Sequence, residues 1–277
     1  MLASGVTTQA GVIVNELIEL AEELAREGNA PSALNLLLQQ VVPALDATGA
    51  YHEAAGAIGR IADILESQGR TEAALALWRE QVLPRTGGIP QLQVEATQRL
   101  AELYAAKGDY DEAIRLRCEE ILPLCQEIED TESFAMNLAY LAETLFQAGR
   151  LDESLECWTE NVLPTYMEMG DDATCALACG KIADIHQARG EHHEALRIRL
   201  HEQIPTYEEL GDLESLVVAR TNLAINLIAR DAEGDYDNAR IILEAALSDA
   251  EEEGLAPADD IRAFMMKRGF LSESVEE

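Results

Sequence analysis

The clearest feature of the sequence is a pattern of aliphatic, small and glycine positions that recurs about every 40 residues. Successive marker glycines are 41, 39, 41 and 41 residues apart, at Gly28, Gly69, Gly108, Gly149 and Gly190. An aliphatic residue followed by alanine begins eight residues before each glycine, a small residue follows five residues after it, and a proline fifteen residues after it. Five copies in one register predict a repeat architecture.

A sixth copy follows in a stretched form. Its Gly234-Asp235-Tyr236 matches Gly108-Asp109-Tyr110, but its Leu223-Ala224 pair begins eleven residues before the glycine. Asp249 stands where the proline would be. Terminal repeats are often atypical, so this copy is interpreted as the last repeat.

Each repeat is expected to form two helices. Before the glycine, apolar residues follow helical spacing, as at Leu100, Leu103 and Tyr104. The glycine suits a left-handed helix cap, and the small residue after it would let the two helices approach closely. The proline falls late in the second helix, where the loss of a backbone donor predicts that the helix kinks or ends.

The pattern Leu100-Ala101-x-x-Tyr104-x-x-x-Gly108-x-Tyr110-x-x-Ala113 resembles the tetratricopeptide repeat. The resemblance covers about residues 12 to 253, with a repeat longer than the 34-residue form. Repeats of this length are similar to those of kinesin light chains, spindle-orientation adaptors and bacterial regulatory proteins. The resemblance implies an all-α, right-handed superhelical solenoid whose inner wall is made by the first helices and binds peptides.

The predicted organisation has three parts. Residues 1–11 lead into the array, residues 12–253 form six helix pairs, and residues 254–277 form a capping helix and an acidic tail. The repeats are expected near 12–50, 51–90, 91–130, 131–171, 172–212 and 213–253. The last helix would cover the open end of the array with one apolar face, formed by Ile261, Phe264, Met265 and Phe270. The alternative is that this helix forms a homodimer contact that depends on Phe264 and Met265.

Composition narrows the classes of partner. The 277 residues include 20 basic and 52 acidic side chains, a net charge of −32, which opposes binding to nucleic acid or to anionic lipid. No apolar run approaches the roughly 18 residues of a membrane span, and the N-terminal sequence lacks a basic leader, so neither membrane insertion nor secretion is expected. Five cysteines without framework spacing indicate reduced thiols in a cytoplasmic protein.

The resemblance places one face of the first helices on the inner wall. Six residues before each marker glycine this face carries a carboxylate, at Glu22, Asp63, Glu102, Glu143 and Asp184. Three residues earlier stand Glu19, Arg60, Arg99, Tyr140 and Lys181. The carboxylates either form i,i+3 ion pairs with Arg60, Arg99 and Lys181, or form a ladder that receives a basic or amphipathic segment. Pairing within one helix would not account for Glu22 or Glu143.

Apolar residues on the same face become more frequent in the fourth and later repeats. Met136, Tyr140, Phe146 and Leu177, with Val218, Ile225 and Ile228, predict an apolar anchor site there. The alternative is that some of these side chains belong to the core between helices. Trp78 and Trp158, nine residues after their glycines, are expected to pack between helices. Since carboxylates stand where the resembled chaperone-binding clamp has asparagine, an acidic chaperone tail is not expected as a partner.

The sequence predicts no catalytic residue and no cofactor. There is no glycine-rich phosphate loop and no Gly-x-Ser-x-Gly elbow, and carboxylates are too abundant to indicate acid–base catalysis. Cys175 and Cys179 with His186 could form a metal site or, with Cys157, a thiol-redox site, but His186 holds a position where other repeats pack a large residue. The expectation is a non-catalytic adaptor, scaffold or regulatory subunit that binds a protein. The alternatives are homo-oligomeric assembly through the end faces and the metal or thiol-redox protein.

Overall fold

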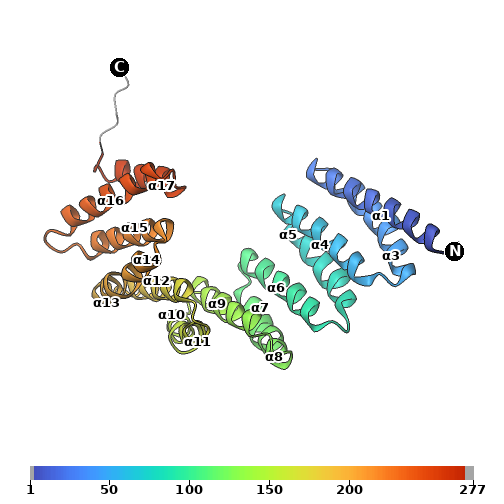
Figure 1. The fold of residues 1–277 in the computed structure, drawn as a ribbon, viewed down its shortest axis with the longest axis horizontal. Coiled ribbons are helices and arrows are strands. Elements are labelled where there is room, and N and C mark those ends of the chain that lie inside the picture. Colours follow the sequence, from blue (N-terminus) through green and yellow to red (C-terminus); the bar gives the residue numbers. More distant parts are fainter. Residues whose placement is uncertain (1–2, 272–277) are drawn as a thin grey trace, which may run out of the picture. The chain divides into compact units, whose positions relative to one another are not determined.

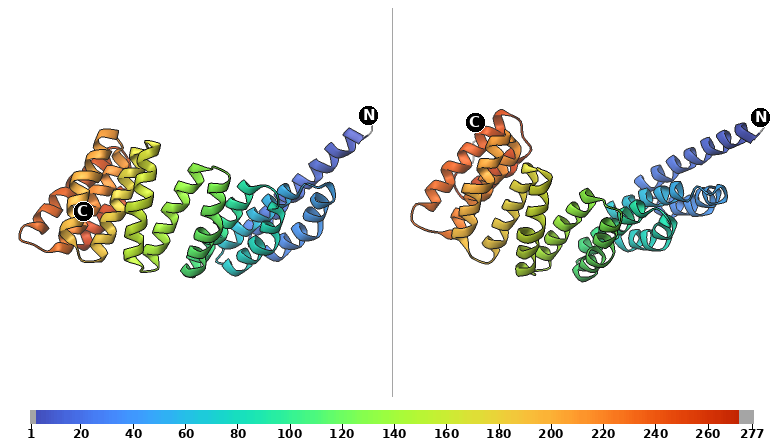
Figure 2. Two further views of the ribbon diagram at one scale, coloured as in Figure 1. Left: turned by 90° about the horizontal axis from the view of Figure 1, so that it is seen from below. Right: turned by 60° about the horizontal axis from the view of Figure 1, so that its bottom comes forward.

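The computed structural model describes residues 3–271, which form helices and, within that range, no strand (Figure 1). The all-α prediction is therefore confirmed. The chain divides into two compact units, Met1–Ala148 and Gly149–Glu277. In each unit the helices follow one another in chain order (Figure 2).

Unit 1 contains the first helix of each of the first four repeats. Shorter helical segments run back from the end of each of these helices to the start of the next; they are called the returning segments. The first helices are α1 (Ala3–Arg26), α4 (Tyr51–Ser67), α6 (Pro90–Lys107) and α9 (Thr131–Gln147). The returning segments are α2 (Ala30–Leu36), η1 (Leu37–Val41), α3 (Val42–Thr48), α5 (Thr71–Leu77), η2 (Trp78–Val82), η3 (Leu83–Thr86), α7 (Tyr110–Leu116), η4 (Arg117–Ile121) and α8 (Leu122–Glu127). Residues 3–11, predicted as a lead-in, belong to α1.

Unit 2 begins with a returning segment and ends with the predicted capping helix. Its first helices are α12 (Asp172–Ala188) and α15 (Leu213–Arg230). Its other segments are α10 (Leu151–Glu156), η5 (Cys157–Val162), α11 (Leu163–Met169), α13 (His192–Ile198), η6 (Arg199–Gln203), α14 (Ile204–Leu210), α16 (Asp235–Glu252) and α17 (Pro257–Lys267). The boundary between the units thus falls inside the fourth predicted repeat, after its first helix.

At the turn between the two helices of a repeat, the marker glycine and the small residue five positions later have the roles that the sequence predicted. Gly108 has a φ of 85°, and the following amide of Asp109 donates to the carbonyl of Tyr104, which satisfies a carbonyl at the end of α6. The small residue five positions after each marker glycine is fully buried in all six repeats, at Ala33, Ala74, Ala113, Ser154, Ala195 and Ala239. A larger side chain there would separate the paired helices.

Of the two predicted outcomes at the prolines, a kink or an end, the end is wrong for four of the five regular repeats. The helix continues beyond the proline as α3, α8, α11 and α14, and only the second repeat stops soon after it, at Thr86. One π turn precedes each proline, formed by η1, η2, η4, η5 and η6. In η1, for example, the amide of Val42 donates to the carbonyl of Leu37, five residues back. A turn of this wider kind can accommodate the ring of Pro43. The helix can therefore continue although proline has no backbone N–H to donate.

The last helix packs against the end of unit 2. In α17, Ile261 is 2% exposed and Met265 is fully buried among residues of α15 and α16. Phe264 and Phe270 pack half-buried at the edge of the same core. Because Met265 is buried within the unit, α17 has the contacts of a capping helix.

Among the described helices, none is long and apolar enough to span a membrane.

Candidate functional site

Ion pairs join the first helices of unit 1 from one repeat to the next. Glu22 on α1 contacts Arg26 on its own helix at 2.9 Å and Arg60 on α4 at 2.5 Å. Asp63 on α4 contacts Arg99 on α6 at 2.8 Å. The carboxylate ladder of unit 1 is therefore interleaved with arginines that bridge neighbouring repeats.

Arg99 is the centre of this chain of charges. Besides Asp63 it contacts Glu66 at 2.9 Å and Glu102 on its own helix. The i,i+3 pair of Arg99 with Glu102 is thus present. Arg60, which the sequence suggested would pair within its helix, instead pairs with Glu22 of the preceding repeat.

The expectation that pairing within one helix would not account for Glu22 is wrong, because Arg26 lies four residues later on α1 and contacts it. Spacing along one helix also omitted Arg60, the second partner, which lies on α4. The pairs leave the ladder partly open to solvent. The side chain of Glu22 is 15% exposed, that of Glu102 is 28% exposed and that of Asp63 is 48% exposed.

The residue nine positions after each marker glycine packs between helices in every regular repeat. These residues are Leu37, Trp78, Arg117, Trp158 and Arg199, of which all but the half-buried Trp78 are at most 3% exposed. The predicted packing of the two tryptophans is confirmed. The sequence also placed Arg117 and Arg199 at this position, but it did not indicate that two buried guanidinium groups would result.

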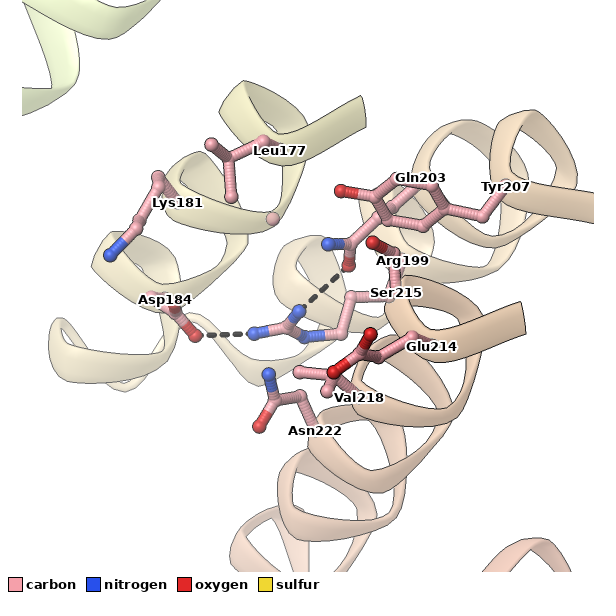
Figure 3. Close-up of a pocket in the computed structure, with 11 residues that line it drawn as sticks. Leu177, Lys181, Asp184, Arg199, Gln203, Tyr207, Glu214, Ser215, Val218 and Asn222 are labelled. Carbon is pink, nitrogen blue, oxygen red and sulfur yellow. Dashed lines mark hydrogen bonds and ion pairs between the residues drawn. The ribbon is translucent and has the colours of Figure 1, made fainter. Parts of the chain in front are cut away.

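In unit 2, Arg199 forms the floor of a cleft between α12 and α15 (Figure 3). The cleft has a volume of about 420 Å³. One wall is α12, the other is α15, and the floor comes from η6 and α14. The lining side chains include Leu177, Lys181, Asp184, Gln203, Glu214 and Asn222. Three predicted site residues, Leu177, Lys181 and Asp184, therefore share this cleft.

The guanidinium of Arg199 is held from three sides. Its Nε donates to Asn226 Oδ1 at 2.6 Å, one terminal nitrogen donates to Gln203 Oε1 at 2.8 Å, and the other contacts Asp184. Burial lowers the pKa of Arg199, and the carboxylate of Asp184 opposes that shift. Asp184 is itself 42% exposed, so it links a buried cation to the surface of the cleft.

A second cleft of unit 2 lies on the other side of α15, against α17. It is mostly apolar and has a volume of about 420 Å³. Val218 and Ile225, predicted as part of an apolar anchor site, lie on its α15 wall, and Pro257, Ile261 and Phe264 lie on its α17 wall. Val218 and Asn222 line both clefts of this unit.

Unit 1 has a comparable apolar cleft between α4 and α6. Its volume is about 470 Å³, and Trp78 lies in its floor. Ala55 and Gly56 of α4 and Leu92 of α6 contribute to its walls, and Met136 of α9 reaches the same cleft. Of the predicted site residues, Arg99 and Met136 therefore meet here.

The other predicted residues of α9 lie apart from this cleft. Tyr140 is 39% exposed, and its ring lies over the guanidinium of Arg117 at 4.9 Å from the ring centroid. Glu143 accepts a hydrogen bond from Gln147 at 3.3 Å, and Phe146 is half-buried.

Three of the five cysteines, Cys125, Cys157 and Cys179, are buried, whereas Cys175 is half-buried and Cys118 is exposed. Burial raises the pKa of Cys179 to about 12, with Glu202 adding to the shift, and raises that of Cys125 to about 11. All five cysteines lie in the described range and none forms a disulfide. Over the same range, no group of three or more His, Cys, Asp or Glu side chains is placed to hold a metal ion.

Comparison with known proteins agrees with this architecture. A sequence model described as "Tetratricopeptide repeat" matches residues 96–117. No curated protein sequence matches the chain significantly.

Solved structures with the same arrangement of helices cover most of the chain. BtubC (BKLC) from P. vanneervenii superposes with a TM-score of 0.60 and 19% identity, over 98% of this chain and 95% of that chain. The TPR-like repeats of a putative kinesin light chain from Podosopora anserina give 0.55 and 21%, over 72% and 96%. A Rap protein complexed with Competence and Sporulation Factor gives 0.53 and 13%, over 92% and 74%.

The matched repeat and these superpositions define a solenoid of helical hairpins. Residues 96–117 match the tetratricopeptide repeat, and the chain has the fold of solenoids built from such repeats, here with a spacing of about 40 residues.

Proposed function

We propose that the chain is a non-catalytic adaptor, scaffold or regulatory subunit that binds a basic or amphipathic segment of a partner protein along its first helices. The observation that carries the proposal is the cleft between α12 and α15, whose floor is fixed by the contacts of Arg199 with Asp184, Gln203 and Asn226. A receptor surface fixed before binding loses little entropy when a peptide docks.

Charge supports a basic partner. The net charge of −32 favours the approach of cations over anions. The ladder carboxylates of Glu22 and Asp63 are also partly accessible, with 15% and 48% of their side chains exposed. Their present arginine partners are themselves partly exposed, and such pairs contribute only about 0–1 kcal/mol, so a partner's arginine or lysine can replace them at small cost.

The similar folds support binding rather than catalysis. The Rap structure contains a bound Competence and Sporulation Factor, and tetratricopeptide arrays are generally interaction scaffolds. Five free cysteines, three of them buried, support a cytoplasmic location. The metal or thiol-redox alternative is not favoured, because the raised pKa of Cys179 makes its thiolate scarce near neutral pH.

Homo-oligomeric assembly remains the second candidate, but the contacts of α17 weaken it. Met265, which a dimer through this helix would need at its surface, is fully buried inside unit 2. A monomeric mass in light scattering at concentrations up to those of the binding experiments is expected. A stable dimer that dissociates in Phe264→Asp would instead favour assembly.

The proposal is tested by selecting peptides from a displayed random library on the purified chain. We expect enriched sequences that combine lysine or arginine with leucine, isoleucine or phenylalanine, and whose affinity falls as salt is raised from 50 to 500 mM, about a threefold change in screening length. Enrichment of acidic peptides, or no enrichment, would contradict it.

A further inference from the structure

We infer that the two clefts on either side of α15 form one bipartite docking site, which takes an apolar side chain in the α17 cleft and an adjacent lysine or arginine toward the α12 cleft. The inference rests on the proposed function and specifies where in the chain the partner segment sits. Both clefts belong to unit 2 and are joined at Val218 and Asn222, which line both.

The α15–α17 cleft provides the apolar part. Its walls carry Ile225 from α15 and Pro257, Ile261 and Phe264 from α17, with few polar groups among them. Val218, at the junction, is 43% exposed, which leaves an uncovered aliphatic surface. An open cleft of about 420 Å³ can accept one large aliphatic or aromatic side chain.

The α12–α15 cleft provides the polar part. Figure 3 shows Asn222 on α15 facing the region of Asp184 and Arg199. Its carboxamide has both donor and acceptor atoms, so it can hydrogen-bond a peptide group that crosses α15 from one cleft to the other. Because Asn222 lines both clefts, it can contact the backbone of the docked peptide between its two anchored side chains.

Charge selects a basic residue over an acidic one beside the apolar anchor. The α12 cleft is lined by two carboxylates, Asp184 and Glu214, and two cations, Lys181 and Arg199, and the α17 cleft adds the carboxylate of Asp260 with no cation among its lining residues. The Arg199 guanidinium is buried and already contacts Asp184, whereas Glu214 in the α12 cleft and Asp260 in the α17 cleft are exposed. A lysine or arginine directed toward the α12 cleft can therefore reach the exposed carboxylate of Glu214.

The test uses the tightest-binding peptide from the library selection, with the full chain as receptor. Ile225→Arg places a charge in the α17 cleft, and Val218→Arg places one at the junction. We expect each to weaken binding about tenfold or more, as for a central anchor position. The matched control is Ile241→Arg on α16, where the native isoleucine is 58% exposed and lies outside both clefts. It should change the affinity less than about twofold.

A second measurement guards against misfolded variants. The same peptide, synthesised with a photoreactive leucine analogue at its apolar anchor, should crosslink the wild-type chain within residues 218–225 or 256–264. Crosslinking to the α4–α6 cleft around Trp78 would overturn the inference while leaving the proposed function intact. Equal loss of binding in Ile225→Arg and Ile241→Arg would also overturn it. If no peptide is enriched at all, the proposed function fails together with this site.

Discussion

Arg117 and Arg199 occupy the same position in two repeats and are equally buried, yet only Arg199 contacts a carboxylate. Arg199 meets Asp184, six residues before the marker glycine of its repeat. The corresponding residue near Arg117 is Glu102, which contacts Arg99 instead. Arg117 donates to Asn137 at 2.9 Å, and its Nε has no acceptor among the described residues. Burial lowers the pKa of Arg117 to about 10, with Glu102 and Tyr140 opposing the shift.

This difference predicts opposite tolerance to the same substitution. Leucine stands at the equivalent position of the first repeat, as Leu37, so the site accepts an aliphatic side chain. Arg117→Leu removes a poorly compensated buried charge, which offsets the loss of the donor to Asn137 Oδ1, and should change the free energy of unfolding by less than about 1 kcal/mol. Arg199→Leu leaves Asn226 and Gln203 with unsatisfied buried groups and should cost about 2–4 kcal/mol. Urea unfolding followed by circular dichroism measures both, and equal destabilisation would contradict the assignment.

The turn before α9 contains a strained residue. Glu129 has a φ of 58°, at the position where three other repeats have Gly49, Gly170 or Gly211. A residue with a Cβ is disfavoured in this left-handed conformation, and the side chain of Glu129 is exposed. Glycine also gives the unfolded chain more conformational freedom, which offsets part of the gain. We expect Glu129→Gly to stabilise the protein by a net amount of about 0.5–1 kcal/mol in thermal unfolding.

The matched control for this turn is Gly170→Ala, which introduces the strain that Glu129→Gly removes. Gly170 has a φ of 71° and open space around its Cβ position, so the backbone conformation alone is tested. We expect a loss of about 1 kcal/mol. A lower melting temperature for Glu129→Gly would show that the left-handed conformation is not costly there.

Two helix-interior glycines should respond to alanine with opposite signs. A Cβ on Gly180 would lie 2.2 Å from Nε2 of Gln203, which holds Arg199, so Gly180→Ala should disturb this network and cost about 1–3 kcal/mol. Gly56→Ala meets only Arg60, at 3.6 Å, and should gain up to about 1 kcal/mol from helix propensity. Denaturant unfolding of the two variants gives the comparison. A stabilised Gly180→Ala would contradict the close packing of Gln203.

Thiol reactivity should follow burial. At pH 8 we expect a colorimetric disulfide reagent to react first with the exposed Cys118 and only slowly with Cys125 and Cys179. Since the pKa values of Cys125 and Cys179 are raised to about 11 and about 12, raising the pH to 9 should leave them almost entirely protonated. Cys118→Ser should remove the fast phase. Rapid labelling of Cys179 in the folded protein would contradict its buried environment and would revive a thiol-based function.

Periodicity was sufficient to predict the fold because each repeat carries the same turn and packing signals. The marker glycines, the buried small residues and the capping role of α17 all follow from positions along the chain. The π turns were not predicted, because the proline rule states that a donor is lost but not how a helix adapts.

The candidate site was predictable only in part. Spacing placed Leu177, Lys181 and Asp184 on one face of α12, and they do share a cleft. It could not show that Arg60 reaches Glu22 or that Arg199 takes Asp184, because several carboxylates stand within reach of each arginine and only packing between helices selects among them. The sequence did contain one indication of the buried Arg199, because this arginine stands at a position where other repeats have Leu37, Trp78 or Trp158.

The most direct test of the central claim, that a first-helix face of this array binds a protein segment, is calorimetric titration of the selected peptide into charge-reversed variants. Glu214→Lys/Asp260→Lys alters the rims of the clefts beside α15, whereas Glu156→Lys/Glu160→Lys makes the same change in net charge on exposed positions of a second helix. We predict that the first pair weakens binding about tenfold or more, and that the second changes it less than about threefold. Equal losses, or no measurable heat with the wild-type chain, would contradict the claim.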